Sequence, residues 1–258
     1  MATVPARRRG LVALATRETA RVLKLWTQTV AAPILSSFLF IVVFGLSLGT
    51  RIDAVDGVSY DMYIVPGLIT MAMVQAAYSN NASSIFQARF ERYINDVLSA
   101  PMRPWEVNLG ITLGGVLRSL LVGAGLFVLS LLVTAVPVRE PLVLLAAVAL
   151  LVGLFGSLGI VVGIYAESFD HHMAVNSIAI LPLAFLGGVF YSVDSLPSPW
   201  QELSLLNPIF HLVQAMRFGF LGVSDVPVGI ALGVTALLTL AVVAWSARLF
   251  STGHRLKA

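Results

Sequence analysis

The sequence contains no cysteine and little charge. Of its 258 residues, 58% are hydrophobic and only 11% are Asp, Glu, Lys or Arg, whereas soluble domains have about 25% charged residues. Without cysteine there is no disulfide framework and no thiolate metal site, and the redox compartment cannot be read from the sequence. The shortage of charge excludes a soluble globular protein and predicts an all-α integral membrane protein. Such a chain has no soluble surface for a basic patch, which argues against nucleic acid as a partner.

Lysine is almost absent, and this excludes one class of enzyme. Lys24 and Lys257 each follow a leucine, so the chain has no G-x-x-x-x-G-K-[ST] phosphate-binding loop and is not its own P-loop ATPase. It also has no G-x-S-x-G elbow of the hydrolase kind, and no catalytic residue is predicted. No apolar segment carries an acidic residue near its middle, and no inverted repeat of broken helices is visible. Both absences weigh against a secondary transporter.

Six apolar segments are long enough to cross a hydrocarbon core of roughly 30 Å at about 1.5 Å per residue. They are residues 27–50, 62–87, 107–136, 142–166, 173–193 and 226–247. The fourth carries glycines at three- and four-residue spacing, a pattern that lets helices pack closely in lipid. These glycines are Gly153, Gly156, Gly159 and Gly163. The whole chain is predicted to form a single transmembrane domain.

A basic amphipathic segment, residues 11–26, precedes the first span. Arg17, Arg21 and Lys24 share one face of the predicted helix, which is typical of a helix lying in the membrane interface. A secretory signal peptide is the alternative interpretation. The apolar region that follows is too long for a signal peptide and lacks an A-x-A cleavage site, so the interface helix is favoured.

A polar stretch, residues 88–104, separates the second and third spans. From Arg89 it reads R-F-E-R-Y-I-N-D-V-L-S-A-P-M-R-P. Its apolar residues recur at helical spacing, which predicts a short amphipathic helix, and Pro101 and Pro104 end that helix because proline lacks the amide proton. We expect this helix to contact a partner outside the bilayer. The predicted contact residues are Phe90, Glu91, Arg92, Tyr93, Ile94, Val97 and Leu98.

Prolines interrupt residues 195–222, which are too short and broken to span. If this segment crossed, the last span would invert and separate the basic tail from the basic N-terminal segment. With six spans, twelve Lys and Arg residues lie on the predicted cytoplasmic side, against three on the outer side beside seven acids. Because Lys and Arg in short loops favour the cytoplasm, both termini are predicted to be cytoplasmic. Residues 195–222 are then predicted to form a re-entrant helical hairpin on the outer face, at the mouth of a pathway.

The outer hairpin region is rich in aromatic residues. Most of them are predicted to form an interfacial belt, and a substrate exit lined by some of them is the alternative. The predicted gate and hairpin residues are Phe190, Tyr191, Trp200, Asn207, Pro208, Phe210 and Arg217.

Arg118 is the one charge inside a predicted span. It is either a contact for an anionic substrate or lipid, or a residue at the start of the hydrocarbon section that snorkels to the interface. The second interpretation is favoured.

Loop 167–172 holds Glu167, Asp170, His171 and His172. A metal site needs three or four converging ligands, which adjacent histidines on one loop rarely supply, so no metal is predicted. A solvated loop is the favoured interpretation, and the role of the two histidines stays open.

Over nearly its whole length the chain resembles the membrane permease subunits of type-2 ABC exporters. The most specific segments are R-Y-I-N-D-V-L-S-A-P-M-R-P-W-E-V and L-G-G-V-F-Y-S-V-D-S-L-P-S-P-W-Q-E-L-S-L-L-N-P-I-F-H-L-V-Q-A-M-R-F-G-F-L-G. The resemblance implies that residues 90–100 form the main coupling helix, which docks into an ATPase. It implies that loop 167–172, with Glu167 and Asp170, is a second ATPase contact. The Asp-His-His of that loop matches no pattern of this family.

The residues and the resemblance lead to one hypothesis. Two permease copies, alike or different, form a pathway in the bacterial cytoplasmic (inner) membrane, in contact with membrane lipid. A separate nucleotide-binding ATPase subunit binds ATP and Mg²⁺, grips the coupling helices and drives export of an amphipathic drug, lipid or glycan. The chain itself is no enzyme and holds no cofactor. The alternatives are a scaffold or channel subunit without ATP coupling and, less favoured, a secondary transporter. The substrate is not identified, and export rather than import rests on the resemblance alone.

Overall fold

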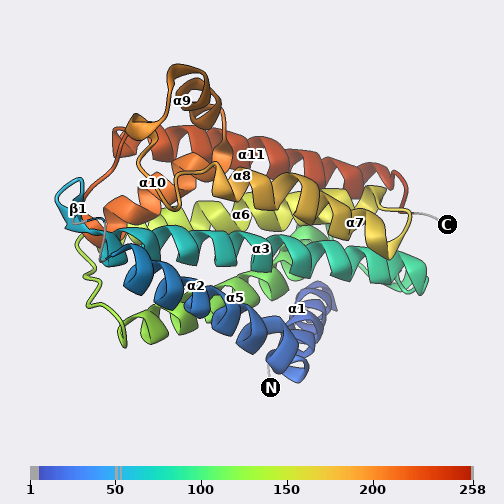
Figure 1. The fold of residues 1–258 in the computed structure, drawn as a ribbon. Helices are drawn as coiled ribbons and strands as arrows, with labels where there is room; N and C mark the ends of the chain where they lie inside the picture. Colours follow the sequence, from blue (N-terminus) through green and yellow to red (C-terminus); the bar gives the residue numbers. More distant parts are fainter. Residues whose placement is uncertain (1–5, 50–51, 53, 257–258) are drawn as a thin grey trace.

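The computed structural model describes residues 6–49, 52 and 54–256, without the side chains of residues 6–9, 46 and 48. Thr50, which ends the first predicted span, and Lys257 of the basic tail lie outside the described residues. The described chain is all-α apart from one two-stranded hairpin, and its long helices run side by side with α1 at an angle to them (Figure 1). This confirms the predicted fold class.

The helices follow one another with short connections. In chain order they are α1 Ala6–Lys24, the π-helical η1 Thr27–Ala31, α2 Ala32–Leu48, α3 Tyr60–Phe90, α4 Ile94–Ser99, α5 Pro104–Ser130, α6 Pro141–Tyr165, α7 Phe169–Val175, the π-helical η2 Asn176–Ile180, α8 Leu181–Phe185, the 3₁₀ turn η3 Val193–Ser195, α9 Ser198–Leu205, α10 Pro208–Leu221 and α11 Val228–Thr252. Strands β1 Ala54–Val55 and β2 Val58–Ser59 pair antiparallel, and a turn of Asp56 and Gly57 joins them. Both of these turn residues have positive φ, as a two-residue hairpin turn requires.

Five segments of the described chain are helical, long and apolar enough to cross a membrane. They are Thr27–Gly45, Tyr60–Phe90, Pro104–Ser130, Pro141–Tyr165 and Val228–Thr252. The predicted span 173–193 is built differently: α7, η2 and α8 continue into one another from Phe169 to Phe185, with a π-helical turn in the middle. The crossing of this segment, and with it the count of six spans, stays a prediction.

Helix α3 is the centre of the bundle and packs against α2, α5, α6 and α10. Its closest neighbour is α6, because glycines of α6 face the α3 backbone. A Cβ atom on Gly159 would lie 2.4 Å from the Tyr78 carbonyl oxygen, and one on Gly163 would lie 2.6 Å from that of Ala82. The glycine pattern predicted from the sequence is therefore a packing face. The glycines do not all face the same helix, since Gly153 faces Thr239 of α11.

Helix α1 rests on α5 through a face that contains an acid. Leu14, Glu18 and Val22 are all buried, at four-residue spacing. Glycines of α5 permit the contact, since a Cβ atom on Gly110 would lie 2.8 Å from Leu14 and one on Gly114 would lie 2.9 Å from Glu18. The sequence alone showed Glu18 only as the single acid of a basic segment.

Burial of Glu18 is compensated by charge and hydrogen bonding. Its carboxylate lies 3.5 Å from Arg17 and 3.1 Å from Arg21, and it accepts a hydrogen bond of 2.8 Å from the Ser84 hydroxyl of α3. A buried carboxylate is tolerable only with such partners. The ion pairs lie within α1, and the hydrogen bond from Ser84 ties α1 to α3.

One end of the bundle gathers the N-terminal helix, α4 and the C-terminal region. A buried apolar cluster there includes Leu14 of α1, Ile94 of α4 and Phe250 of α11. Arg89, at the end of α3, donates a hydrogen bond of 3.0 Å from Nε to the Arg255 carbonyl. The two terminal regions thus lie at the same end, as two cytoplasmic termini require. Which side of the membrane this end faces stays a prediction.

The opposite end holds the β-hairpin and the connections around α10 (Figure 1). The Arg139 amide donates to the Gly219 carbonyl at 3.1 Å. The Val193 amide donates to Asp225 Oδ2 at 2.8 Å, which joins the two ends of the segment that contains α9 and α10. The segment that holds α9 and α10 therefore begins and ends at the same place. Its re-entry into the membrane from the outer face stays a prediction.

Candidate functional site

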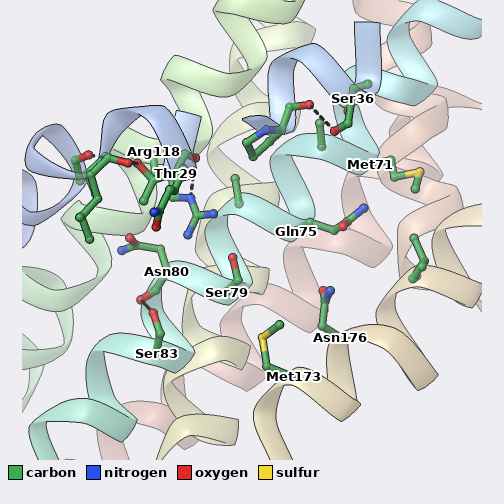
Figure 2. A pocket seen from close by; sticks show the side chains of 18 of the residues that line it. Thr29, Ser36, Met71, Gln75, Ser79, Asn80, Ser83, Arg118, Met173 and Asn176 are labelled. Carbon is green, nitrogen blue, oxygen red and sulfur yellow. Dashed lines mark hydrogen bonds between the residues drawn. The ribbon is translucent and has the colours of Figure 1, made fainter. Parts of the chain in front are cut away.

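A cavity of about 700 Å³ lies along α3 between the α1–α2 segment and the α7–α8 segment. Its volume is in the range of ligand pockets, about 300–1,000 Å³. Figure 2 shows side chains from several helices that line it. The polar and charged lining residues are Arg21, Gln28, Thr29, Ser36, Ser37, Gln75, Ser79, Asn80, Ser83, Arg118, His172 and Asn176. None of the lining residues is a carboxylate.

The polar wall of α3 was not singled out from the sequence. Gln75, Ser79 and Ser83 follow one another at four-residue spacing within the second predicted span, so they lie on one face of the helix. That spacing is a signal that sequence reasoning could have used. The α7–α8 residues that face this wall across the cavity could not be predicted, because the sequence does not show which helices pack beside α3.

Arg118 of α5 is one of the residues that line this cavity. Its Nε donates a hydrogen bond of 2.9 Å to the Thr29 carbonyl of η1 (Figure 2). Thr29 stands at the start of the first span, so Arg118 lies at the level expected for the start of the hydrocarbon section. Its side chain nonetheless faces the cavity and not the outer surface of the bundle.

The two predicted ATPase contacts meet in one aromatic group. Phe86 of α3 packs against Phe90 at 5.9 Å, Phe169 at 6.1 Å and His172 at 5.8 Å between ring centroids. Phe90 is 77% exposed and Phe169 is 56% exposed. We call these four residues the aromatic patch. It joins the coupling stretch to loop 167–172, and two of its members, Phe169 and His172, also line the cavity.

The apolar residues of the coupling stretch point in two directions. Ile94 is 1% exposed and belongs to the buried cluster, with Val97 and Leu98 packed against it. Tyr93 is half-buried: Arg17 donates a hydrogen bond to its hydroxyl and lies 4.1 Å from its ring centroid. These residues attach α4 to the rest of the helical bundle. Phe90 is the large apolar side chain of the predicted contact set that remains free for a partner.

The predicted coupling helix, residues 90–100, is not one continuous helix in the structure. Helix α3 continues to Phe90, and Arg92 has a φ of 63°, which breaks the helix before α4 begins. A non-glycine residue with positive φ is uncommon. The break lets Ile94 turn inward while Phe90 stays outside.

Charged residues surround the aromatic patch. Glu91 is exposed and accepts a hydrogen bond of 2.7 Å from the Gln87 side chain. Glu167 is exposed and lies 3.7 Å from Arg255. Arg92, Asp170 and His171 are exposed as well. Within the described residues, no group of His, Cys, Asp and Glu is placed to hold a metal ion.

The two adjacent histidines have different surroundings. His171 is exposed, whereas His172 is 1% exposed, and its carbonyl accepts a hydrogen bond of 2.9 Å from the Tyr78 hydroxyl. Burial lowers the pKa of His172 below the ordinary 6.5, because it disfavours the imidazolium, and the Asp170 carboxylate opposes this effect. His172 is therefore neutral at pH 7.

We expect His172 to make the folded protein sensitive to mild acid. Because its pKa is lower in the folded than in the unfolded protein, the unfolded protein binds more protons, so stability is lost as pH falls through about 6.5 and below. The melting temperature should fall between about pH 7.5 and about pH 5.5, and the fall should be smaller in His172→Gln. His171→Gln is the matched control and should behave as wild type. Equal falls in wild type and His172→Gln would refute the assignment.

Arg217, predicted as an outer hairpin residue, is fully buried on α10. Its Nη2 donates to the Gly188 carbonyl at 2.5 Å, its Nη1 lies 4.0 Å from Asp225 Oδ1, and its guanidinium lies 3.8 Å from the Tyr63 ring centroid. It connects α10 to α3 and to the two ends of the hairpin.

The remaining hairpin residues divide into capping, packing and exposed groups. Asn207 caps α10 by accepting from the Ile209 amide at 2.9 Å, and Pro208 occupies the first turn, as helix starts favour. Phe210 is buried. Phe190 lies 5.1 Å from Phe44 of α2 between ring centroids.

Two residues of the hairpin set stay accessible. Tyr191 is half-buried, and Trp200 of α9 is 49% exposed. The gate role of the whole set stays a prediction.

Comparison with known proteins agrees with this architecture. Residues 9–221 match the family described as ABC-2 type transporter. The inner membrane transport permease YadH of Escherichia coli (strain K12) is 38% identical over 232 residues, covering 89% of this chain and 91% of that protein. Nodulation protein J of Rhizobium leguminosarum bv. viciae is 26% identical over 217 residues, covering 82% and 84%. The chain belongs to the ABC-2 type transporter family.

Proposed function

We propose that this permease is the transmembrane subunit of an ATP-driven exporter. A separate P-loop ATPase binds ATP and Mg²⁺ and docks on the aromatic patch and the charged residues around it. ATP-driven closure of that subunit moves the helices that border the cavity and releases an amphipathic substrate at the opposite end, past the α9–α10 hairpin.

The observation that carries this proposal is the double role of the aromatic patch. Phe90 and Phe169 are exposed at the surface, while Phe169 and His172 also line the cavity. A partner that displaces the patch therefore moves the cavity wall directly. Exposed aromatic residues with a charged rim are also the usual composition of a docking site.

A second permease copy fits the exposed helices. Leu35 and Leu39 of α2 are more than half exposed, and α2 borders the cavity. A second copy packed against α2 would enclose the pathway between the two subunits, whereas membrane lipid would cover faces such as that of α11.

A scaffold or channel subunit without ATP coupling is the second candidate. The buried Arg217 and the tightly packed α3–α6 pair are compatible with either function. The aromatic patch favours the exporter, because a scaffold has no need of a surface that is continuous with the cavity wall.

The test is ATP hydrolysis by a candidate P-loop ATPase subunit, reconstituted with the permease in vesicles. We expect wild-type permease to associate with it and raise its hydrolysis rate. Phe90→Ala should weaken the complex by about 30-fold or more, the effect of losing a hot-spot aromatic worth about 2 kcal/mol. Glu91→Arg should weaken it as well, by reversing an exposed charge.

The matched control is Leu142→Ala, which removes an equally exposed apolar side chain, 79% exposed, at the start of α6. It should leave association and hydrolysis unchanged. If no ATPase associates, or if Phe90→Ala and Glu91→Arg both behave as wild type, the exporter proposal fails and the scaffold takes its place.

A further inference from the structure

The cavity contains a cation without an acidic partner. Two arginines line it, and they differ in their neighbours. Arg21 lies 3.1 Å from the Glu18 carboxylate, which Arg17 also approaches, so Glu18 is already shared by two cations. Among the described residues, Arg118 lies within salt-bridge distance of no carboxylate, and its hydrogen bond to Thr29 uses only Nε.

An arginine in this position carries a cost. A charged side chain within a membrane-spanning helix is costly and is usually retained for a function. Arg118 is 14 residues from the start of α5 at Pro104, about 21 Å along the helix. Arg118 lines the cavity (Figure 2), where a bound anion could accept two parallel hydrogen bonds from the planar guanidinium.

The cavity changes character along its length. On α3, Ser83, Asn80 and Gln75 line the part near Arg118, and Met71 lines a part farther along (Figure 2). Leu68, three residues before Met71 on the same helix, also lines the cavity. Leu68 and Ser83 are 15 residues apart, roughly 22 Å of helix. The apolar part is completed by Phe40 of α2 and Phe185 of α8. The cavity thus has one end that is cationic and rich in hydrogen-bonding groups, and another end that is apolar.

We propose that this cavity binds an amphipathic molecule with an acidic headgroup, such as a phosphate monoester, and that Arg118 pairs with that group. The apolar tail lies along Met71 and Leu68 toward Phe40 and Phe185. The proposal rests on the proposed transport function in that it names the chemical class of the substrate. The same headgroup chemistry is offered by a transported amphiphile and by a resident acidic lipid.

Arg118 also has a purely structural role to be separated from this one, because its Nε bond joins α5 to η1. The test therefore needs a variant that keeps the cation and a variant that removes it. Arg118→Lys keeps the charge, and Arg118→Gln removes it but can still donate a hydrogen bond. Arg248→Gln, which removes an exposed cation of α11, is the matched control.

The experiment measures binding to the permease alone, purified in neutral detergent, by native mass spectrometry. The probes are dioctanoyl phosphatidic acid, dioctanoyl phosphatidylcholine and inorganic phosphate. We expect phosphatidic acid to bind about tenfold more tightly than phosphatidylcholine, and inorganic phosphate to bind far more weakly than either. Arg118→Gln should lose about tenfold or more in affinity for phosphatidic acid, the size of one charge-assisted hydrogen bond. Arg118→Lys should retain most of that affinity, and Arg248→Gln all of it.

Equal binding of phosphatidic acid and phosphatidylcholine, or an unchanged affinity in Arg118→Gln, overturns the proposal. Equal binding of inorganic phosphate overturns the role given to the tail. Addition of phosphatidic acid to the ATPase complex in phosphatidylcholine vesicles separates the two sources of the ligand. Stimulated hydrolysis supports a transported amphiphile, and binding without stimulation supports a resident lipid in the same site. Because binding is measured without the ATPase, failure of ATP coupling leaves this result standing, and the reverse also holds.

Discussion

Replacing Asp225 with asparagine should destabilise the protein more than any other conservative substitution at the hairpin end. Arg217 is 0% exposed and the Asp225 side chain 2% exposed, so the substitution leaves a buried guanidinium without its carboxylate. Breaking a buried ion pair from one side costs about 3–5 kcal/mol, mostly because the remaining charge is unpaired. Asparagine still accepts the bond from the Val193 amide, so the effect isolates the charge. Thermal unfolding in detergent measures it.

Two further variants make the Asp225 prediction specific. Asp194→Asn removes an exposed carboxylate near the same end and should change stability by no more than about 0.5 kcal/mol. Combining Asp225→Asn with Arg217→Met removes both charges and should recover much of the loss, because the pair then leaves no buried ion. A melting temperature of Asp225→Asn equal to that of wild type would show that the ion pair does not hold the hairpin.

Substituting alanine for Gly159 should force α3 and α6 apart. The new Cβ would lie 2.4 Å from the Tyr78 carbonyl oxygen and 3.1 Å from the Ala82 amide nitrogen. Both atoms belong to the backbone, so no side-chain rotation relieves the contact. Overpacking of this kind costs about 1–3 kcal/mol. Since α3 lines the cavity, we also expect weaker binding of phosphatidic acid, measured in the assay above beside the melting temperature.

Gly233→Ala is the matched control for Gly159→Ala. Gly233 lies within α11, and a Cβ atom there meets nothing within 4 Å. Alanine is favoured over glycine inside a helix by about 1 kcal/mol, so this variant should be as stable as wild type or more stable. If both glycine variants changed stability in the same direction and by the same amount, close approach of α3 and α6 would not be the cause.

Features with a local cause could be predicted from the sequence. Pro104 begins α5 because proline suits the first turn of a helix and cannot continue the preceding one. Asn207 and Pro208 begin α10 for related reasons. The apolar spans and the glycine face of α6 follow from composition and from helical spacing.

Features that depend on the direction of a helical face were not predictable. Ile94 and Phe90 are both apolar members of the coupling stretch, yet Ile94 is buried and Phe90 is exposed. The positive φ at Arg92 decides the difference, and nothing in the local sequence demands it, because arginine has no preference for that conformation. Glu18 and Asp225 likewise look like ordinary surface acids until their partners are known.

Composition and local patterns were enough to predict an all-α membrane protein and several local features, such as the helix starts at Pro104 and Pro208. Those properties depend on hydropathy, proline and spacing, which act over a few turns of helix. The tertiary structure alone decided that Phe86 unites the two predicted ATPase contacts, that Arg217 pairs with Asp225, and that Arg118 faces a cavity without a carboxylate. Each of these depends on which helix faces meet across the bundle, and packing between distant segments fixes that choice.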